Sequence, residues 1–568
     1  MFFVALATDY DGTLALHGHV DQPTREALGE VRESGRKLLL VTGRDLADLK
    51  RVFDQLELFD LVVAENGGLL YDPVTKEEIP LAEPPPKVLV DRLRSLAVDP
   101  LSVGRTIIAT WEPNEKIVLD AIRALAIEQH IIFNKGAVMV LPSDVNKASG
   151  LLKVLQRMNL SPLNVVAIGD AENDLPFLDA CGCGVAVANA LDTVKEKADF
   201  VVADHGAGVI ELARELTEND LSPRQHAIPR AQPVIGELSD GEHVRLSPFE
   251  TLLVTGSSGG GKSTIVTSLL EQIRELGYQF CVVDPEGDYG GLGDAVVLGD
   301  AKQLPRIRES MELLRRPDVN VVINLLAVDP PDRPAFLAKL LPELAKLRTE
   351  TGRPHWIVLD EAHHCLPAKW DPAPVTLPRE LPAVIAVTVH PEQVVQDFLE
   401  LVSTVVGVGD GASAAIESYC KVRGLEQVTG AKSPERGEVL LLRGNDQLRV
   451  VAVRRPKDKQ QRHVRKYAEG ELGEDKSFYF RGPESALNLR AQNLSMFLQL
   501  AVGVDDRTWL HHLKEGAYSK WFRNSIKDQD LAAEAAVVEE AESPSAEESR
   551  ARIKELVERR YTAPAKAE

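Results

Sequence analysis

The sequence has few cysteines and no long apolar run, and these absences exclude several classes of protein. Its five cysteines show neither the spacing of a zinc site nor that of a disulfide framework. We interpret them as reduced thiols in core positions, and we expect a cytoplasmic protein. No apolar stretch approaches the roughly 20 residues of a membrane-spanning helix. We therefore expect no membrane association. The cysteines lie at Cys181, Cys183, Cys281, Cys365 and Cys420.

The chain is also short of positive charge. Its 65 Lys and Arg residues face 86 Asp and Glu residues, which gives a formal net charge of -21 at pH 7. A nucleic-acid backbone is repelled by such a balance unless basic residues cluster locally. Hydrophobic residues make up 44%, enough for sizeable cores, and 568 residues are too many for one core. We expect a soluble protein of two or three domains.

The sequence pattern predicts an α/β protein. Residues 1–220 and 221–460 both alternate short apolar runs with amphipathic stretches, which is typical of buried parallel strands joined by helices. Residues 461–530 concentrate tryptophan and tyrosine, and we expect a small, mainly helical segment with an aromatic core. The alternative is a base-stacking surface that begins with the basic run Arg462–Tyr467. Residues 531–568 are rich in Ala and Glu and predict a disordered acidic tail.

The first motif with a chemical interpretation is Asp9-Tyr10-Asp11-Gly12-Thr13, directly after an apolar run. One carboxylate at such a strand end can attack phosphorus, and a second can protonate the leaving group. Taken alone, the motif fits a calcium loop or an ordinary turn equally well. Three later elements favour phosphoryl transfer: Thr42 offers a hydroxyl, Lys147 a positive charge, and residues 170–174 carboxylates suited to Mg²⁺.

These four elements, in this order, resemble the motifs of the haloacid dehalogenase (HAD) superfamily of aspartyl-phosphate hydrolases. The resemblance covers about residues 1–215 and implies a Rossmann-like domain. It implies that Asp9 is the nucleophile and a magnesium ligand. By the same resemblance, Asp11 is the general acid/base and lends its backbone carbonyl to the metal. Thr42 and Lys147 are then expected to hold the phosphoryl group.

The same resemblance assigns the remaining metal ligands and a cap. It implies that Asp170 ligates magnesium and that Asp174 supports that ligation or Lys147. Residues 65–68 and 184–190 resemble the Cof-like, sucrose-phosphatase-like IIB branch, in which residues 68–145 would form an α/β cap. A closing cap excludes bulk water and favours a small phosphorylated metabolite, such as a sugar phosphate or phosphoglycolate. The alternative is a HAD fold kept as a scaffold, but no catalytic position is missing.

A second phosphate-binding motif, Gly256 to Ser263, fits G-x-x-x-x-G-K-[ST] between a predicted strand and a predicted helix. The glycines let backbone N–H groups surround the phosphates of ATP, Lys262 reaches the β and γ oxygens, and Ser263 binds Mg²⁺. Asp360 and Glu361 follow the apolar run 356–359 as a Walker B pair. Asp360 would act through the magnesium shell, and Glu361 would polarise the attacking water. The nucleotide-binding residues are predicted to be Gly256, Gly259, Gly261, Lys262, Ser263, Thr264 and Asp360.

Together with residues 284–289 and 360–363, the P-loop resembles the HerA/FtsK division of ring-forming P-loop ATPases, over about residues 234–453. The resemblance implies a RecA-like domain and a homo-oligomer formed through it. Thr388 or His390 stands where the family commonly has a glutamine that senses the γ-phosphate, so the choice of sensor stays open. The choice of arginine finger is equally open, and the candidates are Arg423, Arg436 and Arg443.

These motifs predict a bifunctional protein. A Mg²⁺-dependent HAD phosphatase would cleave a small phosphomonoester, and a fused HerA-like domain would bind and hydrolyse ATP. Two alternatives come from other classes of function. One is a DNA-processing or DNA-translocating ATPase with an end-trimming phosphatase, against which the predicted cap and the acidic balance both weigh. The other is an ATP-gated signalling protein whose C-terminal segment binds a partner.

Overall fold

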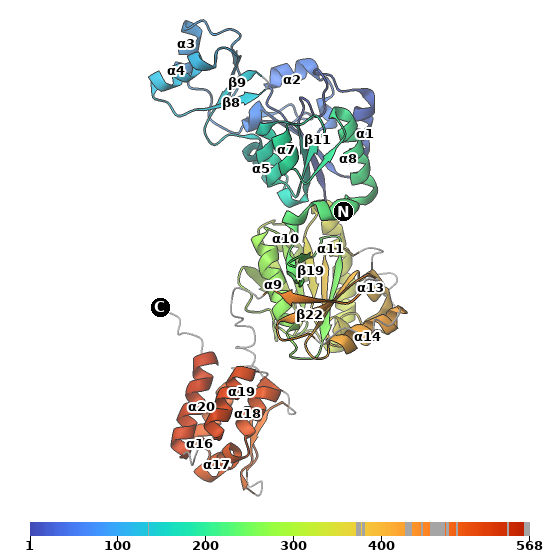
Figure 1. Ribbon diagram of the computed structural model, residues 1–568, viewed down its shortest axis with the longest axis vertical. Helices are drawn as coiled ribbons and strands as arrows, with labels where there is room; N and C mark the ends of the chain where they lie inside the picture. Colours follow the sequence, from blue (N-terminus) through green and yellow to red (C-terminus); the bar gives the residue numbers. More distant parts are fainter. Residues whose placement is uncertain are drawn as a thin grey trace.

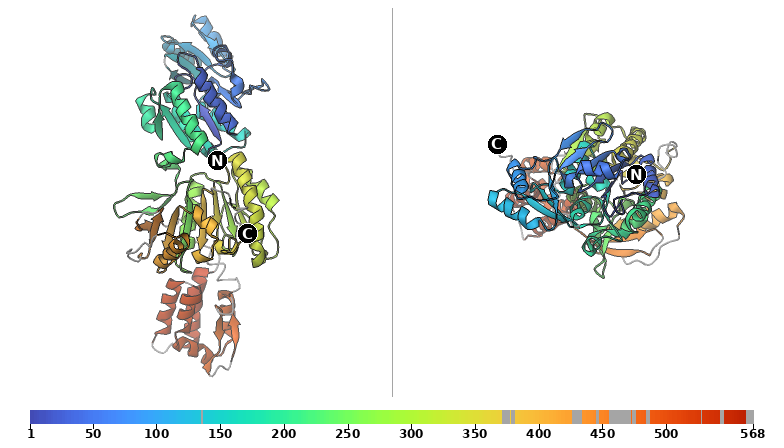
Figure 2. Two further views of the ribbon diagram at one scale, coloured as in Figure 1. Left: turned by 90° about the vertical axis from the view of Figure 1, so that its right-hand side faces the viewer. Right: turned by 90° about the horizontal axis from the view of Figure 1, so that it is seen from above.

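The computed structural model shows three bodies along one long axis (Figures 1 and 2). The amino-terminal body lies at one end, the P-loop body in the middle and the helical carboxy-terminal body at the other end. Within the part of the chain that the structure describes, no helix has both the length and the apolarity needed to cross a membrane. The structure describes residues 1–561 except 135, 371–376, 378–380, 426–433, 445–446, 455–471, 473–475, 484–486, 527 and 542–544.

The amino-terminal body is built on an eight-stranded sheet of order β12-β11-β10-β1-β2-β3-β4-β5. Its first six strands in that order are parallel, and β4 and β5 add an antiparallel edge. Flanking helices pack in pairs, α1 with α8 and α5 with α6. The strands are β1 (Ala5–Thr8), β2 (Lys37–Val41), β3 (Leu61–Ala64), β4 (Leu69–Tyr71), β5 (Glu78–Pro80), β10 (Val165–Gly169), β11 (Cys183–Val187) and β12 (Phe200–Val202). The helices are α1 (Gln22–Glu33), α2 (Leu46–Val52), α5 (Lys147–Arg157), α6 (Leu175–Ala180), α7 (Asp192–Lys197) and α8 (His205–Asn219).

The cap is a separate four-stranded antiparallel sheet of order β6-β7-β9-β8 with two helices. It is shorter than the predicted range 68–145, because residues 69–80 form β4 and β5 of the main sheet. Leu69 and Leu70 are buried there against β3, so this hairpin belongs to the core. The cap elements are α3 (Lys87–Ser95), β6 (Ser102–Val103), β7 (Ile108–Trp111), α4 (Glu115–Leu125), β8 (His130–Asn134) and β9 (Ala137–Leu141).

The middle body has an eleven-stranded sheet of order β14-β13-β23-β22-β21-β15-β20-β19-β16-β18-β17. The seven strands from β21 to β17 are parallel, and the four at the other edge are antiparallel. Its strands are β13 (Val234–Glu237), β14 (His243–Arg245), β15 (Thr251–Gly256), β16 (Phe280–Asp284), β17 (Ala295–Leu298), β18 (Asn320–Asn324), β19 (Trp356–Leu359), β20 (Val384–Thr388), β21 (Thr404–Val408), β22 (Glu438–Arg443) and β23 (Arg449–Val453). Its helices are α9 (Lys262–Glu275), α10 (Ile307–Leu314), α11 (Arg333–Thr351), α13 (Gln396–Leu401) and α14 (Ala412–Arg423).

The described residues of the carboxy-terminal body form a hairpin and five α-helices around an aromatic core, as the tryptophan and tyrosine content predicted. The Trp509 and Tyr518 rings stack at 4.4 Å, and Trp509 Nε1 donates to Ser549 Oγ at 3.0 Å. We expected residues 531–568 to be disordered, but the structure shows two helices there. Helices α19 (Gln529–Glu539) and α20 (Ala546–Tyr561) bury an apolar face that includes Leu531 and Ile553. The basic run at 462–467 lies outside the described residues. The elements are β24 (Phe478–Phe480), β25 (Leu489–Ala491), α16 (Leu494–Gly503), α17 (Asp506–Lys514), α18 (Ala517–Trp521), α19 (Gln529–Glu539) and α20 (Ala546–Tyr561).

The first two bodies meet at the amino-terminal ends of their strands. Asn164, directly before β10, donates to the carbonyl oxygens of Phe2 (2.8 Å) and Gly352 (3.3 Å). His355, directly before β19, lies with Nε2 at 2.9 Å from Asn164 Oδ1, and its Nδ1 accepts from the N–H of Gln279 at 2.8 Å. Burial lowers the pKa of His355 well below its ordinary value, so the ring is neutral and Nε2 carries the proton. Both bodies therefore share a buried, satisfied polar contact.

Aromatic packing surrounds this contact. The Phe2 ring lies 5.7 Å from the Phe249 ring, 6.3 Å from the Tyr278 ring and 6.0 Å from the His355 ring. Buried apolar residues of both bodies belong to one continuous cluster. The first two bodies are thus joined by a shared core as well as by the chain.

We expect Asn164→Ala to destabilise this joint. The substitution leaves His355 Nε2–H and the carbonyl oxygens of Phe2 and Gly352 buried without their partner, a cost of about 2–3 kcal/mol. Calorimetry should show a lower first unfolding transition. The matched control is Asn159→Gly, which removes an exposed hydrogen bond to the Arg315 carbonyl at the same interface and keeps the φ of +57° that glycine tolerates. Equal melting of both variants and the wild type would show that the joint does not form in solution.

Candidate active sites

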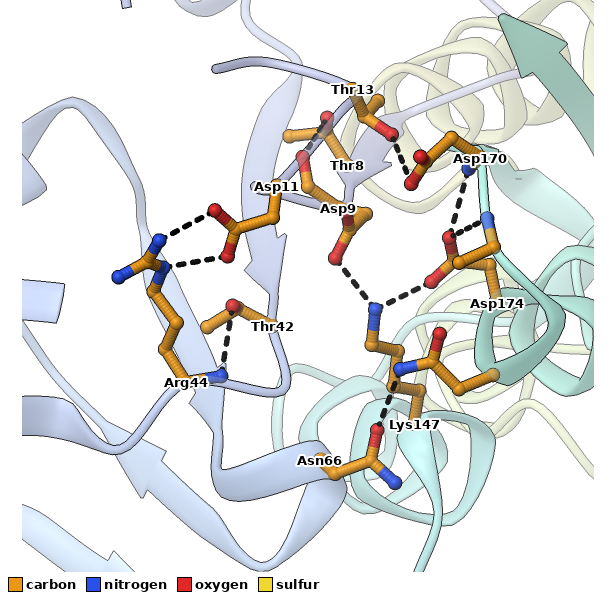
Figure 3. A network of polar contacts seen from close by, with 12 residues as sticks. Thr8, Asp9, Asp11, Thr13, Thr42, Arg44, Asn66, Lys147, Asp170 and Asp174 are labelled. Carbon is orange, nitrogen blue, oxygen red and sulfur yellow. Dashed lines mark hydrogen bonds and ion pairs between the residues drawn. The ribbon is translucent and has the colours of Figure 1, made fainter. Parts of the chain in front are cut away.

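The carboxyl ends of β1 and β10 bring three buried carboxylates together around one lysine (Figure 3). Asp9 follows β1, and Asp170 and Asp174 follow β10. One oxygen of each lies within 4.8 Å of the others. Lys147 opens helix α5 and donates through Nζ to Asp9 Oδ1 at 2.6 Å and to Asp174 Oδ1. Both motifs reach one point because parallel strands present all their carboxyl ends at one edge.

The charge balance of this cluster favours a cation. Lys147 is 1% exposed, and its carboxylate neighbours raise its pKa, so it stays protonated. Burial, together with Asp174 and Asp170, raises the pKa of Asp9 to about 8 despite the opposing effect of Lys147. Three carboxylates share one ammonium group, and a divalent cation among them would relieve the excess negative charge. The donor set therefore fits magnesium.

Asp174 accepts hydrogen bonds at both of its carboxylate oxygens. Its Oδ2 accepts from the backbone N–H groups of Asp170 and Ala171, both at 2.9 Å, while Oδ1 accepts from Lys147. Asp170 keeps a longer contact, 3.5 Å, with the Thr13 hydroxyl. Asp174 thus orients both Lys147 and the loop that carries Asp170.

The opposite wall of the site is formed by the end of β2. Thr42 is fully buried, and its Oγ1 accepts from the N–H of Arg44 at 3.2 Å. Arg44 donates through Nε and Nη2 to the two carboxylate oxygens of Asp11, each at 2.6 Å, and through Nη1 to Asp48. Sequence reasoning gave Arg44 no role, since its pairing with Asp11 depends on the turn that brings β1 and β2 together.

Two further contacts support the site, and the sequence alone did not indicate what either of them does. Glu65, buried after β3, accepts from the N–H groups of Arg105 (2.9 Å) and Thr106 (2.7 Å), so it ties the cap to the main domain. The Gly67 backbone has φ +106° and passes so close to Asn146 that a Cβ would lie 2.0 Å from its carbonyl oxygen. Only glycine fits there, which explains part of the motif at 65–68.

The second site lies between β15 and α9, where the P-loop was predicted. Gly256 has φ +141°, and a Cβ there would lie 2.1 Å from the Val408 carbonyl oxygen, so only glycine fits. Lys262 is buried and donates through Nζ to the carbonyl oxygens of Gly256 and Ser257, both at 3.1 Å. Burial lowers the pKa of Lys262, and nearby acidic residues oppose this effect. Ser263 and Thr264 lie in the first turn of α9, and Gly259 and Gly261 have positive φ.

The Walker B pair follows β19 on a neighbouring part of the same sheet edge. Asp360 is 4% exposed and lies 3.5 Å from the Tyr289 hydroxyl, while Asp284 shapes the loop that carries Tyr289. Glu361 has φ +40°, a left-handed conformation that costs a non-glycine residue of order 1 kcal/mol or more. Such backbone strain is common at functional positions. Because β19 and β15 both run parallel to β20, the residues that follow β19 lie at the same end of the sheet as the P-loop.

The two candidates for the γ-phosphate sensor, Thr388 and His390, lie at the end of β20 and just beyond it. Thr388 is fully buried at the end of β20, and its Oγ1 contacts His363 Nδ1 and the His390 N–H, both at 3.0 Å. Burial and two nearby histidines lower the pKa of His363 to about 4, so its ring is neutral. The His390 ring lies against Glu392. Thr388 and His363 therefore form a fixed pair beside Glu361.

The three candidate finger arginines lie at different places around the sheet. Arg443 pairs with Thr404 at the start of β21 and contacts Glu250, so it lies at the end opposite the P-loop. Arg423 ends helix α14. Arg436 precedes β22 and is exposed at the same end as the P-loop, because β22 runs antiparallel to β21.

The two sites point away from each other. Asp9 and Asp170 follow the carboxyl ends of their strands, and Asp360 does the same in the middle body, while the joint lies at the amino-terminal ends of both sheets. Asp9 comes seven positions after Phe2 and Asp360 five positions after His355, so at about 3.3 Å per residue the sites lie roughly 40 Å apart. No small substrate can therefore contact both sites at once.

Comparison with known proteins gives separate matches for the first body and for the middle body. Residues 6–98 and 107–212 match the haloacid dehalogenase-like hydrolases, and residues 234–367 match the central domain of helicase HerA. The chain is 32% identical over 225 residues to a phosphoglycolate phosphatase of Methanopyrus kandleri, covering 37% of this chain and 96% of that protein. It is 33% identical over 226 residues to a phosphoglycolate phosphatase of Methanothermobacter thermautotrophicus, covering 37% and 97%.

A solved structure of a haloacid dehalogenase-like hydrolase from Bacteroides thetaiotaomicron is 21% identical, with a TM-score of 0.34, over 38% of this chain and 99% of that one. The relatives from Methanopyrus and Methanothermobacter are matched over nearly their whole length by the first body alone. That body also holds the complete set of four motifs. The chain therefore belongs to the haloacid dehalogenase-like hydrolases and carries, in addition, a domain of the HerA type.

Proposed function

We propose that the first body is a magnesium-dependent phosphatase for a small phosphomonoester of the phosphoglycolate type. The observation that carries the proposal is the convergence of Asp9, Asp170 and Asp174 on the buried Lys147. Support for the substrate class comes from the relatives named phosphoglycolate phosphatase, which this body matches over more than nine tenths of their length. The cap over the site favours a small substrate over a polymer.

The chain's own groups divide the work of phosphoryl transfer. Asp9 attacks phosphorus, an Asp9–phosphorus bond forms, and the bond to the leaving oxygen breaks while Asp11 gives that oxygen a proton. Lys147 and Thr42 hold the phosphoryl oxygens. Asp11 then takes a proton from water, the water oxygen attacks phosphorus, and inorganic phosphate leaves Asp9 free.

The metal would be held by the acidic side of this site. Asp9 and Asp170 would supply carboxylate oxygens, and Asp11 its backbone carbonyl. Asp174 would support the ligation, since its oxygens already accept hydrogen bonds from Lys147 and from two backbone N–H groups. Magnesium, when bound, neutralises charge on the phosphoryl oxygens.

We further propose that the middle body binds and hydrolyses ATP and acts as an oligomer. The glycine geometry of the P-loop, the buried Lys262 and the Asp360–Glu361 pair support nucleotide binding. The match to the HerA central domain supports the oligomer. Of the finger candidates, Arg436 has the position to reach a neighbouring subunit's nucleotide. Any effect of ATP on the phosphatase must travel through the shared core, because the two sites face opposite ways.

A screen of phosphate release tests the proposal. Phosphoglycolate, sugar phosphates and nucleotides would be assayed with Mg²⁺, with EDTA, and with and without ATP. We expect phosphoglycolate to be hydrolysed fastest, and EDTA to remove the activity because the acidic cluster then lacks its cation. Turnover of none of these phosphomonoesters in the presence of Mg²⁺ would refute the proposal. A rate that changes with ATP would show that the two bodies are coupled.

DNA processing is the second candidate function, and the match to the HerA central domain favours it. The formal net charge of -21 weighs against it, as does the cap over the first site. A DNA-driven motor would show ATP hydrolysis that DNA stimulates and that salt strongly suppresses.

A further inference from the structure

His363 lies between the Walker B glutamate and the buried threonine at the end of β20. Its Nδ1 atom is 3.0 Å from Thr388 Oγ1 and 3.5 Å from Glu361 Oε2. The first contact is a good hydrogen bond, and the second needs only a small movement of the ring to become one. A nitrogen lone pair would repel the carboxylate oxygen, so these neighbours assign the proton to Nδ1. The Nδ1–H group can therefore donate to either oxygen.

The hydrogen bonds of Thr388 leave its own proton for a further partner. The Thr388 side chain is fully buried, and its Oγ1 accepts from the His390 N–H and from His363 Nδ1–H, both at 3.0 Å. A threonine hydroxyl has two lone pairs and one proton. Both lone pairs are thus occupied, and the proton remains to be donated. An oxygen of the γ-phosphate is a charged acceptor of the kind that ATP would bring to this end of the sheet.

The neighbouring strand places a second buried hydroxyl beside Thr388. Thr255 is the register partner of Thr388 on β15 and directly precedes Gly256 of the P-loop. Register partners on parallel strands present their side chains on the same face of a sheet. The Thr255 hydroxyl is buried and, within the part of the chain that the structure describes, makes no hydrogen bond. Two buried hydroxyl groups thus lie next to the phosphate-binding loop with hydrogen-bonding capacity to spare.

Two other histidines adjoin His363 without taking its place. The backbone N–H of His390, rather than its ring, contacts Thr388. The His364 ring packs on the His363 ring at 4.2 Å, and the His390 ring meets it edge-on at 5.7 Å. The His364 N–H donates to the Glu361 carbonyl at 2.8 Å, so Glu361 and His363 belong to one tight turn. The His363 ring is therefore held between its neighbours, with Nδ1 facing both Thr388 and Glu361.

We propose that His363 is a positioning residue that couples γ-phosphate binding at Thr388 to the orientation of Glu361. The inference rests on the proposed ATP hydrolysis in the middle body. Before ATP binds, His363 Nδ1–H donates to Thr388. When the Thr388 hydroxyl donates to a γ-phosphate oxygen and shifts toward it, His363 Nδ1–H moves to Glu361 Oε2, where the charged acceptor gives the stronger hydrogen bond. No proton is transferred, and one hydrogen bond changes its acceptor.

This exchange fixes Glu361 for catalysis while a γ-phosphate is present. One carboxylate oxygen of Glu361 is held by His363, and the other accepts from the attacking water. ADP has no γ-phosphate, so with ADP the Nδ1–H group stays on Thr388. Loss of this donor should lower kcat for ATP and leave nucleotide affinity unchanged, because His363 acts through Glu361.

The test compares two amide variants that place an N–H donor at different ends of the ring position. The amide of His363→Asn lies where Nδ1 was, whereas that of His363→Gln lies near Nε2. We expect His363→Gln to lower kcat for ATP by about 10- to 100-fold, the effect of one hydrogen bond to a charged group. Its KM and its affinity for a non-hydrolysable ATP analogue should not change, and His363→Asn should retain most of the wild-type rate. The control is His364→Gln, which alters the neighbouring ring of the same turn and should keep the wild-type rate.

A second measurement observes the hydrogen bond of the wild type directly. In histidine-labelled protein, NMR should show the His363 Nδ1–H proton further downfield with Mg²⁺ and the ATP analogue than with Mg²⁺ and ADP. The reason is that a hydrogen bond to a carboxylate is shorter than one to a hydroxyl. The resonance is assigned by its absence from the spectrum of His363→Asn. The same position with both nucleotides would refute the exchange.

Four other outcomes overturn the account. Equal kcat losses in His363→Gln and His363→Asn would show that the position of the donor does not matter. A higher KM with an unchanged kcat would place His363 in nucleotide binding instead. An equal loss in His364→Gln would show that the turn responds to any change of packing. A wild type that binds the analogue but hydrolyses no ATP would refute the proposed ATPase function itself, which the other three results leave standing.

Discussion

Asp9→Asn should abolish phosphate release from phosphomonoesters and leave ATP hydrolysis unchanged. An amide cannot form the phosphorylated intermediate, and loss of a catalytic nucleophile costs roughly 10⁴-fold or more in turnover. The ATP site lies on the opposite side of the shared core, so it should not sense the change. The measurement is phosphate release from phosphoglycolate and from ATP, made on the same preparation. Residual phosphatase turnover above about 1% of the wild type would contradict the assignment.

Folding of this variant can be checked through its pH dependence. Burial among carboxylates raises the pKa of Asp9 from an ordinary 3.8 to about 8 in the metal-free chain. A raised pKa means that the folded state binds the proton more tightly than the unfolded state, so this contribution to stability is lost as pH rises from 3.8 toward 8. Asp9→Asn removes the titrating group. In EDTA at pH 8 the variant should therefore melt no lower than the wild type.

Lys262→Ala should abolish ATP hydrolysis and leave the phosphatase unchanged. Lys262 supplies the positive charge at the P-loop, and removal of one such group costs roughly 10²- to 10³-fold in turnover. In the wild type, Lys262 Nζ donates to the carbonyl oxygens of Gly256 and Ser257. The variant loses these two hydrogen bonds but keeps the hydrophobic core intact. The measurement is ATP hydrolysis alongside phosphoglycolate hydrolysis.

The matched control for this variant is Lys339→Ala, an exposed lysine of α11 in the same body. It should leave both activities at the wild-type level. ATP hydrolysis that persists in Lys262→Ala would show that the P-loop does not bind the nucleotide productively. Loss of both activities in Lys262→Ala would instead show that the phosphatase depends on a nucleotide in the middle body.

Much of both sites could be predicted because their residues follow buried strands directly. Asp9 ends one apolar run and Asp170 another, and parallel strands deliver such residues to one edge whatever the details of packing. The same rule placed the P-loop and Asp360 together. The alternation of apolar runs also predicted the α/β class of the first two bodies, while the helical third body was expected from its aromatic residues.

Contacts between distant elements could not be predicted in this way. The Arg44–Asp11 pair depends on how two turns approach each other, and the Asn164–His355 contact depends on how two bodies dock. The hairpin at 69–80 carries apolar residues that suit either a cap or the main sheet, and only its pairing with β3 decides. Helix α20 holds a buried Ile553 in a segment whose composition alone resembles a disordered tail.

The most direct measurement of the nucleophile is mass spectrometry of Asp11→Asn quenched during turnover of p-nitrophenyl phosphate. This substrate needs no general acid to depart, so Asp9 should still be phosphorylated, while the step in which water must lose a proton should be slow. We expect one phosphoryl group on the peptide that contains Asp9, and none on that peptide in Asp9→Asn/Asp11→Asn. A phosphoryl group on another residue, or steady phosphate release with Asp9 never modified, would contradict the central role given to Asp9.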